Sequence, residues 1–141
     1  MIFDGMSRDQ LREMYRSAWR KFRAEQALSP LEKQIVAVIS EHPEYRAIIE
    51  SAASDLANYS PRGGQLNPWL HMGLHLAIRE QVSTNRPAGI AEVHAKLSAK
   101  LGAHEAEHRI LDVLAEQLWE AQRGGKLPDE NAYLERLRAL A

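Results

Sequence analysis

Apolar side chains recur along this chain at intervals of three and four residues, which is the period of an amphipathic helix. The first such stretch follows Ser7, which has capping-box spacing to Gln10 and precedes an apolar face running from Leu11 to Phe22. No stretch shows a convincing alternation of apolar and polar residues. The pattern therefore predicts an all-α fold, a single-domain bundle of six or seven helices joined by short loops.

Proline, glycine and capping residues set the boundaries of the predicted helices. Ser29-Pro30-Leu31-Glu32 combines an N-cap serine, a proline in the first turn and a capping-box glutamate, and Asn67-Pro68 repeats the cap and proline. The residue before a proline disfavours the helical region, so Pro43 should end the second helix near His42. The remaining predicted segments are a third helix from Pro43 through Leu56, a loop at Ser60–Gln65, a fourth helix to about Ser83, and helices that begin near Ile90, His104 and Pro128.

Length and composition limit the classes of protein that fit. A chain of 141 residues is long enough for one hydrophobic core and short for two, so residues 1–141 are expected to form one helical domain. Hydrophobic and charged contents of 45% and 26% are ordinary for a globular protein. The absence of cysteine excludes disulfides, iron–sulfur clusters and thiolate zinc sites, which leaves imidazole and carboxylate as metal ligands.

The N-terminal residues carry no signal-peptide pattern. No apolar run approaches the roughly 20 residues that span a membrane. We therefore expect no membrane association and a cytoplasmic location.

Two pairs of histidines are the most informative feature of the sequence. His71 and His75 lie one helical turn apart on an apolar helix, in the same arc as Leu74. His104 and His108 repeat that spacing and are expected to face or border the core. Short connections favour antiparallel neighbours, so the two histidine-bearing helices should run parallel, with both pairs near one end of the bundle. The pairs are therefore expected to converge.

Converging pairs of imidazoles suit a divalent metal such as iron, zinc or manganese. Residues at i and i+4 project from one helix face, and a facing helix can complete the coordination shell. Glu105 and Glu107 are candidate carboxylate ligands or bases. The leading hypothesis is a metal site formed by His71, His75, His104 and His108, with hydrolytic or oxygen-dependent chemistry if the protein is an enzyme.

Three other interpretations of the histidines remain open. They can be structural, bonded to buried backbone or to carboxylates, or they can form an anion site at two helix N-termini. His104-Glu105-Ala106-Glu107-His108 also matches the H-E-x-x-H pattern of zinc metalloproteases. Those enzymes need a strand or groove for the peptide, and no strand is predicted here, so a protease is disfavoured.

A row of arginines on the first helix supports an alternative function. Arginines one turn apart present successive forks that bind phosphate or carboxylate groups. Such a face could dock an acidic protein or RNA in a non-catalytic interaction module, with the histidines structural, or it could simply be solvated. The candidate partner-binding residues are Arg8, Arg12, Arg16 and Arg20.

Several motifs together resemble a known family. Asn67-Pro68-Trp69-Leu70-His71-Met72-Gly73-Leu74-His75, His104–His108, His42-Pro43-Glu44-Tyr45 and Leu118-Trp119-Glu120-Ala121-Gln122 are similar to an uncharacterised proteobacterial family, domain of unknown function 1841. The likeness covers most of the chain. It implies no activity, because the family has no established biochemistry to carry onto these positions.

Overall fold

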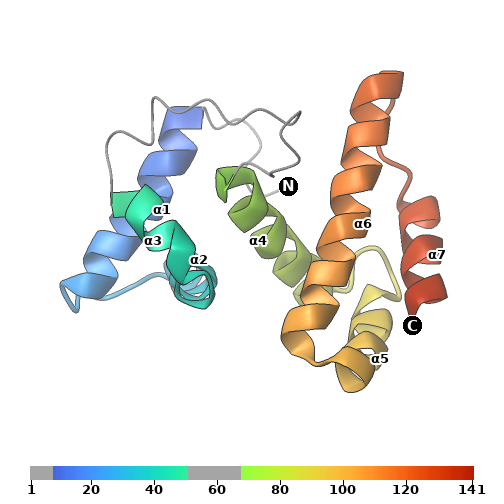
Figure 1. Ribbon diagram of the computed structural model, residues 1–141, viewed down its shortest axis with the longest axis horizontal. Coiled ribbons are helices and arrows are strands. Elements are labelled where there is room, and N and C mark those ends of the chain that lie inside the picture. Colours follow the sequence, from blue (N-terminus) through green and yellow to red (C-terminus); the bar gives the residue numbers. More distant parts are fainter. Residues whose placement is uncertain (1–7, 51–67) are drawn as a thin grey trace. The chain divides into compact units, whose positions relative to one another are not determined.

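The computed structural model describes residues 8–50 and 68–141 (Figure 1). Over these residues it contains α-helices α1 to α7 and one short 3₁₀ turn, η1, with no strand. The all-α prediction is confirmed. Residues 51–67, which include the predicted loop and the end of the predicted third helix, lie outside the described part.

The chain divides into two compact units, Met1–Leu76 and Ala77–Ala141. Helix α4 (Pro68–Thr84) crosses this boundary, so its first half belongs to the first unit and its second half to the second. The expectation of one domain stays a prediction, and each unit is described by itself.

The first unit is built from helices whose ends match their capping residues. Helix α1 (Arg8–Arg23) is followed by α2 (Pro30–Glu41), whose N-cap Ser29 accepts from the backbone of Glu32 while Glu32 accepts from the backbone of Ser29. This reciprocal pair satisfies two amide groups that the first helical turn leaves without intrahelical partners. The predicted capping box is therefore confirmed.

Helix α2 ends at His42, as Pro43 predicts, and the chain turns through η1 (Pro43–Tyr45) into α3 (Arg46–Glu50). The backbone N–H of His42 donates to the carbonyl oxygen of Ile39 at 3.1 Å, which closes the last turn. The predicted third helix thus starts as a 3₁₀ turn. The turn redirects the chain after α2 and fixes the position of the His42 side chain.

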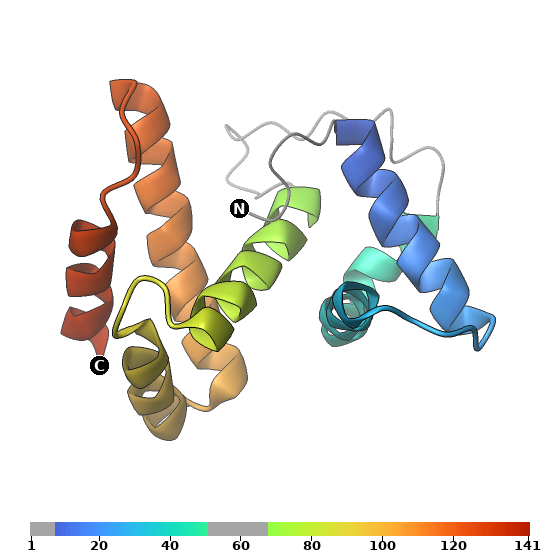
Figure 2. The ribbon, with the colours of Figure 1, turned by 180° about the vertical axis from the view of Figure 1, so that it is seen from behind.

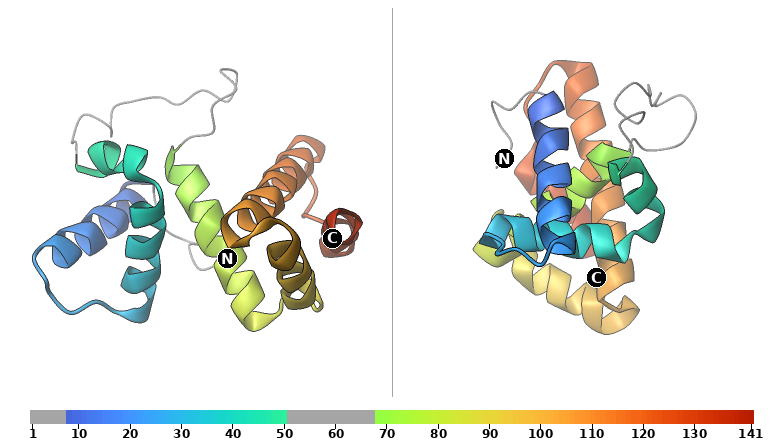
Figure 3. Two further views of the ribbon diagram at one scale, coloured as in Figure 1. Left: turned by 60° about the horizontal axis from the view of Figure 1, so that its bottom comes forward. Right: turned by 90° about the vertical axis from the view of Figure 1, so that its left-hand side faces the viewer.

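The core of the first unit contains residues of α1, α2 and α3 and of the start of α4. Figures 2 and 3 show the ribbons of α1, α2 and α3 next to one another. Trp69 stacks on Tyr15 with ring centroids 5.8 Å apart, which ties α4 to α1. Trp19 donates from Nε1 to Glu50 at 2.9 Å and so ties α1 to α3. The buried residues of this core are Tyr15, Ala18, Trp19, Ile35, Val36, Val38, Ile39, Ile49, Trp69, Met72 and Leu76.

The second unit contains the end of α4 with α5 (Ile90–Leu101), α6 (Ala103–Gly124) and α7 (Glu130–Leu140). Figures 1 and 2 show α6 and α7 side by side and antiparallel, joined by a short turn. Gly125 ends α6 in the left-handed conformation that glycine adopts without strain, and Asp129 caps α7. The apolar core of this unit contains Ala77, Ile78, Ile90, Val93, Leu97, Ala106, Ile110, Leu111, Leu114, Tyr133, Leu134 and Leu137.

Among the described helices, none has both the length and the apolar content that crossing a membrane requires.

Candidate metal centre

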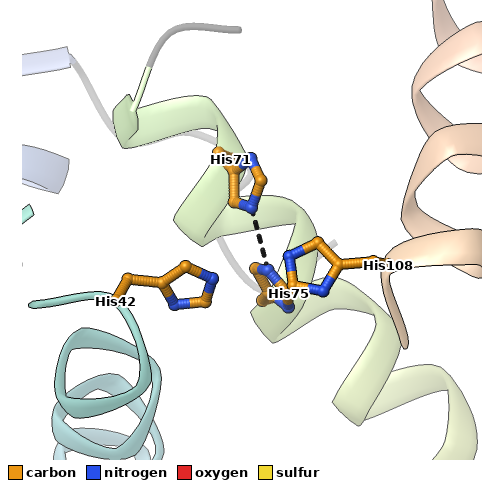
Figure 4. A group of neighbouring side chains, drawn as sticks. All are labelled: His42, His71, His75 and His108. Carbon is orange, nitrogen blue, oxygen red and sulfur yellow. Dashed lines mark hydrogen bonds between the residues drawn. The ribbon is translucent and has the colours of Figure 1, made fainter. Parts of the chain in front are cut away.

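The first unit brings together histidines from two helices, His42 at the C-cap of α2 and His71 and His75 on α4 (Figure 4). One ligand nitrogen from each of these rings lies within 4.8 Å of the others. His42 and His75 are buried, with 4% and 1% of their surface exposed, whereas His71 is half-buried. A group of imidazoles this close and this sheltered from solvent is the strongest chemical feature of the described chain.

His42 is oriented by its own helix. Its Nδ1 lies 2.8 Å from the carbonyl oxygen of Val38, one turn earlier in α2. A carbonyl oxygen only accepts, so Nδ1 carries the proton, and in the neutral ring Nε2 carries the lone pair. Donation of the second ring N–H to a backbone carbonyl is the usual arrangement of a metal-ligating histidine, because it fixes both tautomer and ring orientation.

His71 and His75 point their Nε2 atoms at each other across one turn of α4, at a distance of 3.0 Å (Figure 4). Two ligands that bind a metal at about 2.1 Å lie about 3.0 Å apart at right angles and about 3.4 Å apart at the tetrahedral angle of zinc, so the pair is close to either spacing. The pair therefore already has the spacing of two neighbouring positions in a coordination shell. The i, i+4 spacing in the sequence produces this geometry directly.

The ring of His42 closes the group from the other side. Its centroid lies 4.6 Å from that of His75 and 5.3 Å from that of His71. Two ligands of one ion lie about 3.4 Å apart in a tetrahedral shell and at most about 4.2 Å apart in an octahedral one, so nitrogens within 4.8 Å of one another need side-chain shifts on the order of 1 Å. Rotamer adjustment of this size needs no change in the helices.

Tyr45 forms an aromatic wall of the group. Its ring stacks on His42 at a centroid distance of 5.3 Å and 8° between planes, and it meets His71 edge-on at 5.7 Å. Burial, and secondarily the charge of Glu44, raise the pKa of Tyr45, so its phenol stays neutral at physiological pH. The wall restricts the space beside His71.

The second histidine pair lies in the second unit, on the first turns of α6. His108 brings Nδ1 to 3.0 Å from the carbonyl oxygen of His104, and the ring centroids are 4.3 Å apart. His104 is exposed, so the expectation that it faces or borders the core is wrong. The buried arc of α6 is centred on Ala106 and Ile110, and His104 falls outside it. Convergence of the two pairs stays a prediction.

Both glutamates of this segment form ion pairs within the second unit. Glu107 accepts from Nε of Arg79 on α4 at 3.1 and 3.3 Å, and the Arg79 Nη2 lies 3.1 Å away, in a largely buried pair. Glu105 pairs with Arg109 at 3.0 Å on the exposed face of α6. These contacts give Glu107 a role in holding α4 against α6. A role for either glutamate as metal ligand or base stays a prediction.

The family is established by sequence comparison. A model described as "Domain of unknown function (DUF1841)" matches residues 7–139. The chain belongs to this family. Comparison with curated proteins and with solved structures finds no match. Membership in DUF1841 assigns no chemistry, so the function must be argued from the residues themselves.

The arginines of α1 do not form one exposed row in this DUF1841 chain. Arg12 is buried, with 3% of its surface exposed, and Arg16 is half-buried. Both guanidinium carbons lie 5.3 Å from the centre of the Trp69 ring, and Arg16 also donates to the carbonyl oxygen of Ile49 at 3.1 Å. Arg20 is exposed and pairs with Glu13, while the Arg8 side chain lies outside the described part. Partner binding through these arginines stays a prediction.

His42 is the candidate ligand that the sequence pattern did not indicate, because the pattern predicted only that the second helix ends near it. That prediction is confirmed, but the same position also places the imidazole beside His71 and His75. The one feature of the sequence that could have pointed to His42 as a site residue is its place in His42-Pro43-Glu44-Tyr45, a motif that carries the family resemblance.

Proposed function

We propose that this protein binds a divalent transition-metal ion through His42, His71 and His75. The observation that supports this most strongly is the donation from His42 Nδ1 to Val38, which directs Nε2 of a buried imidazole towards the pair on α4. A hydrogen bond between His71 and His75 that only stabilised α4 would not require a third imidazole, that of His42, beside it. The arrangement therefore fits metal binding better than a purely structural role.

The ligand type narrows the choice of metal. Imidazole nitrogen suits zinc and iron, whereas manganese prefers oxygen ligands. Of the metals considered from sequence, zinc and iron are therefore the expected occupants. If the protein is an enzyme, the proposal extends only to the broad class of its reaction, in which the metal activates water or oxygen.

Metal stoichiometry tests the proposal. The protein is purified without a histidine tag, dialysed against zinc or iron(II) under anaerobic conditions, and its metal content is measured by mass spectrometry. We expect one ion per chain. Loss of an outer-shell partner typically costs 10–100-fold in metal affinity, so loss of a ligand in H71A should cost at least about 100-fold.

Matched variants separate ligation from folding. H75Q replaces a fully buried ring with a polar side chain, and H42Q keeps a polar group at the helix end, while H94A removes a partly exposed histidine on α5 as a control. Far-ultraviolet circular dichroism checks that each variant is folded. Wild-type protein without stoichiometric metal, or folded H71A, H75Q and H42Q variants that bind as tightly as H94A, would overturn the proposal.

The second pair is tested in the same assay. H104A and H108A measure whether these histidines supply further ligands, as the sequence pattern predicts. A fall in affinity of H108A comparable to that of H71A supports a shell completed by the second pair. An unchanged affinity limits the ligands to His42, His71 and His75.

A further inference from the structure

Helix α6 exposes a tryptophan near its C-terminal end. Trp119 is 55% exposed, and the guanidinium of Arg123, one turn later, lies over its ring at 4.4 Å from the centroid. A cavity of about 330 Å³ lies beside the indole, lined by Trp119, Glu120, Arg123 and Gly124. Tryptophan and arginine are enriched at the energetic centres of protein interfaces, so this end of α6 is a candidate contact surface.

The face of α6 that carries Trp119 points away from the core of the second unit. At about 100° per residue, Ile110 in the buried arc lies about 180° from Trp119 around the helix. Asp112, Glu116 and Arg123 lie within about 60° of Trp119, and all three are exposed. The tryptophan is therefore the centre of an outward face whose other members are charged.

The charge of this face changes sign at Trp119. Asp112 and Glu116 precede the tryptophan by two turns and one turn, whereas Arg123 follows it by one turn and Lys126 lies just past the end of α6. Asp112, Glu116 and Lys126 form no ion pair with any residue of 8–50 or 68–141. An acidic half and a basic half thus lie on either side of one exposed indole.

A second copy of α6 in antiparallel orientation complements this pattern. In a twofold dimer, residue i contacts residue j of the other copy and residue j contacts residue i. Glu116 and Arg123 stand about 4.5 Å and about 6 Å along the axis from Trp119, on opposite sides, so with the two indoles at the twofold axis Glu116 of each copy faces Arg123 of the other. Asp112 and Lys126 are related in the same way. A partner carrying only one sign of charge would match only half of the face.

We infer that the face of α6 formed by Asp112, Glu116, Trp119 and Arg123 is a docking surface for a second copy of this chain, with the two α6 helices antiparallel and the two indoles in contact. One helix face covers less area than the roughly 1,200 Å² at the low end of stable interfaces, so the dimer is weak and its population depends on concentration.

Sedimentation velocity of the full chain, from micromolar to millimolar concentration and with a chelator present, measures this association without any contribution from metal. We expect wild-type protein to pass from monomer to dimer. The dissociation constant of W119A should rise by at least about 30-fold, because truncating a central interface tryptophan removes a dominant contact. F22A, which removes an exposed aromatic side chain on α1, is the matched control and should associate like wild-type protein.

E116R and R123E test the antiparallel arrangement. Either substitution alone places like charges opposite each other in both halves of the dimer, so each variant should associate more weakly than wild-type protein. In an equimolar mixture every introduced charge faces its opposite, so a heterodimer should form, and circular dichroism checks that each variant is folded. Wild-type protein that stays monomeric, folded W119A that associates like F22A, or a mixture that associates no more tightly than its components would overturn the inference.

Discussion

Nε2 of His71 lies 3.0 Å from Nε2 of His75, one turn along α4. At this distance the metal-free rings share one proton, with one ring donating and the other accepting. A metal ion bound by the proposed site would take the place of that shared proton and hold the two nitrogens close to their present spacing. The helix therefore places these two rings before any metal binds. The ring of His42 is oriented separately, by its hydrogen bond to the carbonyl oxygen of Val38.

Zinc should raise the melting temperature of the protein. Ligand that binds only the folded state at 100 times its dissociation constant stabilises by about 2.7 kcal/mol. An ion at the proposed site would join His42 at the end of α2 to His71 and His75 on α4, two helices separated by residues 43–67. Differential scanning calorimetry should show an increase of several degrees in wild-type protein and H94A, and a much smaller increase in H71A. An equal increase in H71A would contradict a site at these residues.

Glu107 should matter more to stability than Glu105. The side chains of the Arg79–Glu107 pair are 25% and 12% exposed, against 54% and 52% for Arg109–Glu105. Neutralising one partner of a largely buried, bidentate pair costs about 1–3 kcal/mol, whereas an exposed pair contributes at most about 1 kcal/mol. Urea unfolding of E107Q and E105Q measures the difference. Zinc content that falls in E107Q would instead favour a ligand role for Glu107.

Glu50 should contribute acid sensitivity to the first unit. The hydrogen bond from Trp19 Nε1 and the charge of Arg23 lower the pKa of Glu50 in the folded protein. A lowered pKa stabilises the folded state above the ordinary carboxyl range near pH 4.3, and this stabilisation is lost as pH falls through the folded pKa. Between about pH 6 and pH 3, the melting temperature of E50Q should fall less than that of wild-type protein.

The control for Glu50 is E25Q, which removes an exposed carboxylate in the turn that follows α1. Its melting temperature should follow the wild-type pH profile. Parallel profiles for all three proteins would show that the Trp19–Glu50 hydrogen bond carries no acid sensitivity.

Tyr133 should anchor α7 to α4. Its hydroxyl donates to Oε1 of Gln81 at 2.7 Å, and only 3% of the residue is exposed. Y133F removes one hydrogen bond with little change in volume, so the free energy of unfolding should fall by about 1 kcal/mol. A double-mutant cycle with Q81L isolates the pair, and additive effects of the two substitutions would exclude a direct interaction.

Burial also raises the pKa of Tyr133, so the buried neutral phenol stabilises the fold below its ordinary ionisation range near pH 10. That contribution is lost as pH rises further, because the unfolded chain ionises first. Above about pH 10, Y133F should therefore lose less stability than wild-type protein. Alkaline melting curves of the two proteins measure this difference.

The arginines of α1 illustrate why residue spacing alone does not show whether a helix face is exposed or buried. Arg12 and Arg16 occupy the i+4 positions expected of an exposed row, yet both lie over the indole of Trp69. A guanidinium stacks on an aromatic ring and its methylene stem packs against apolar surface, so an arginine can be buried where a lysine would be costly. The aromatic partner comes from α4, far along the sequence, and the spacing within α1 carries no information about it.

The sequence by itself determined the features that depend on interactions between residues close together in the chain. The helices, the capping box at Ser29, the end of α2 before Pro43 and the pairing of His71 with His75 all follow from interactions within a few positions of the chain. Tertiary structure decided which helices meet. It brought His42 to the pair on α4, buried Arg12 against Trp69 and left His104 exposed. Helical periodicity fixes the angle between side chains on one helix, but the centre of the buried arc depends on the helices packed against it.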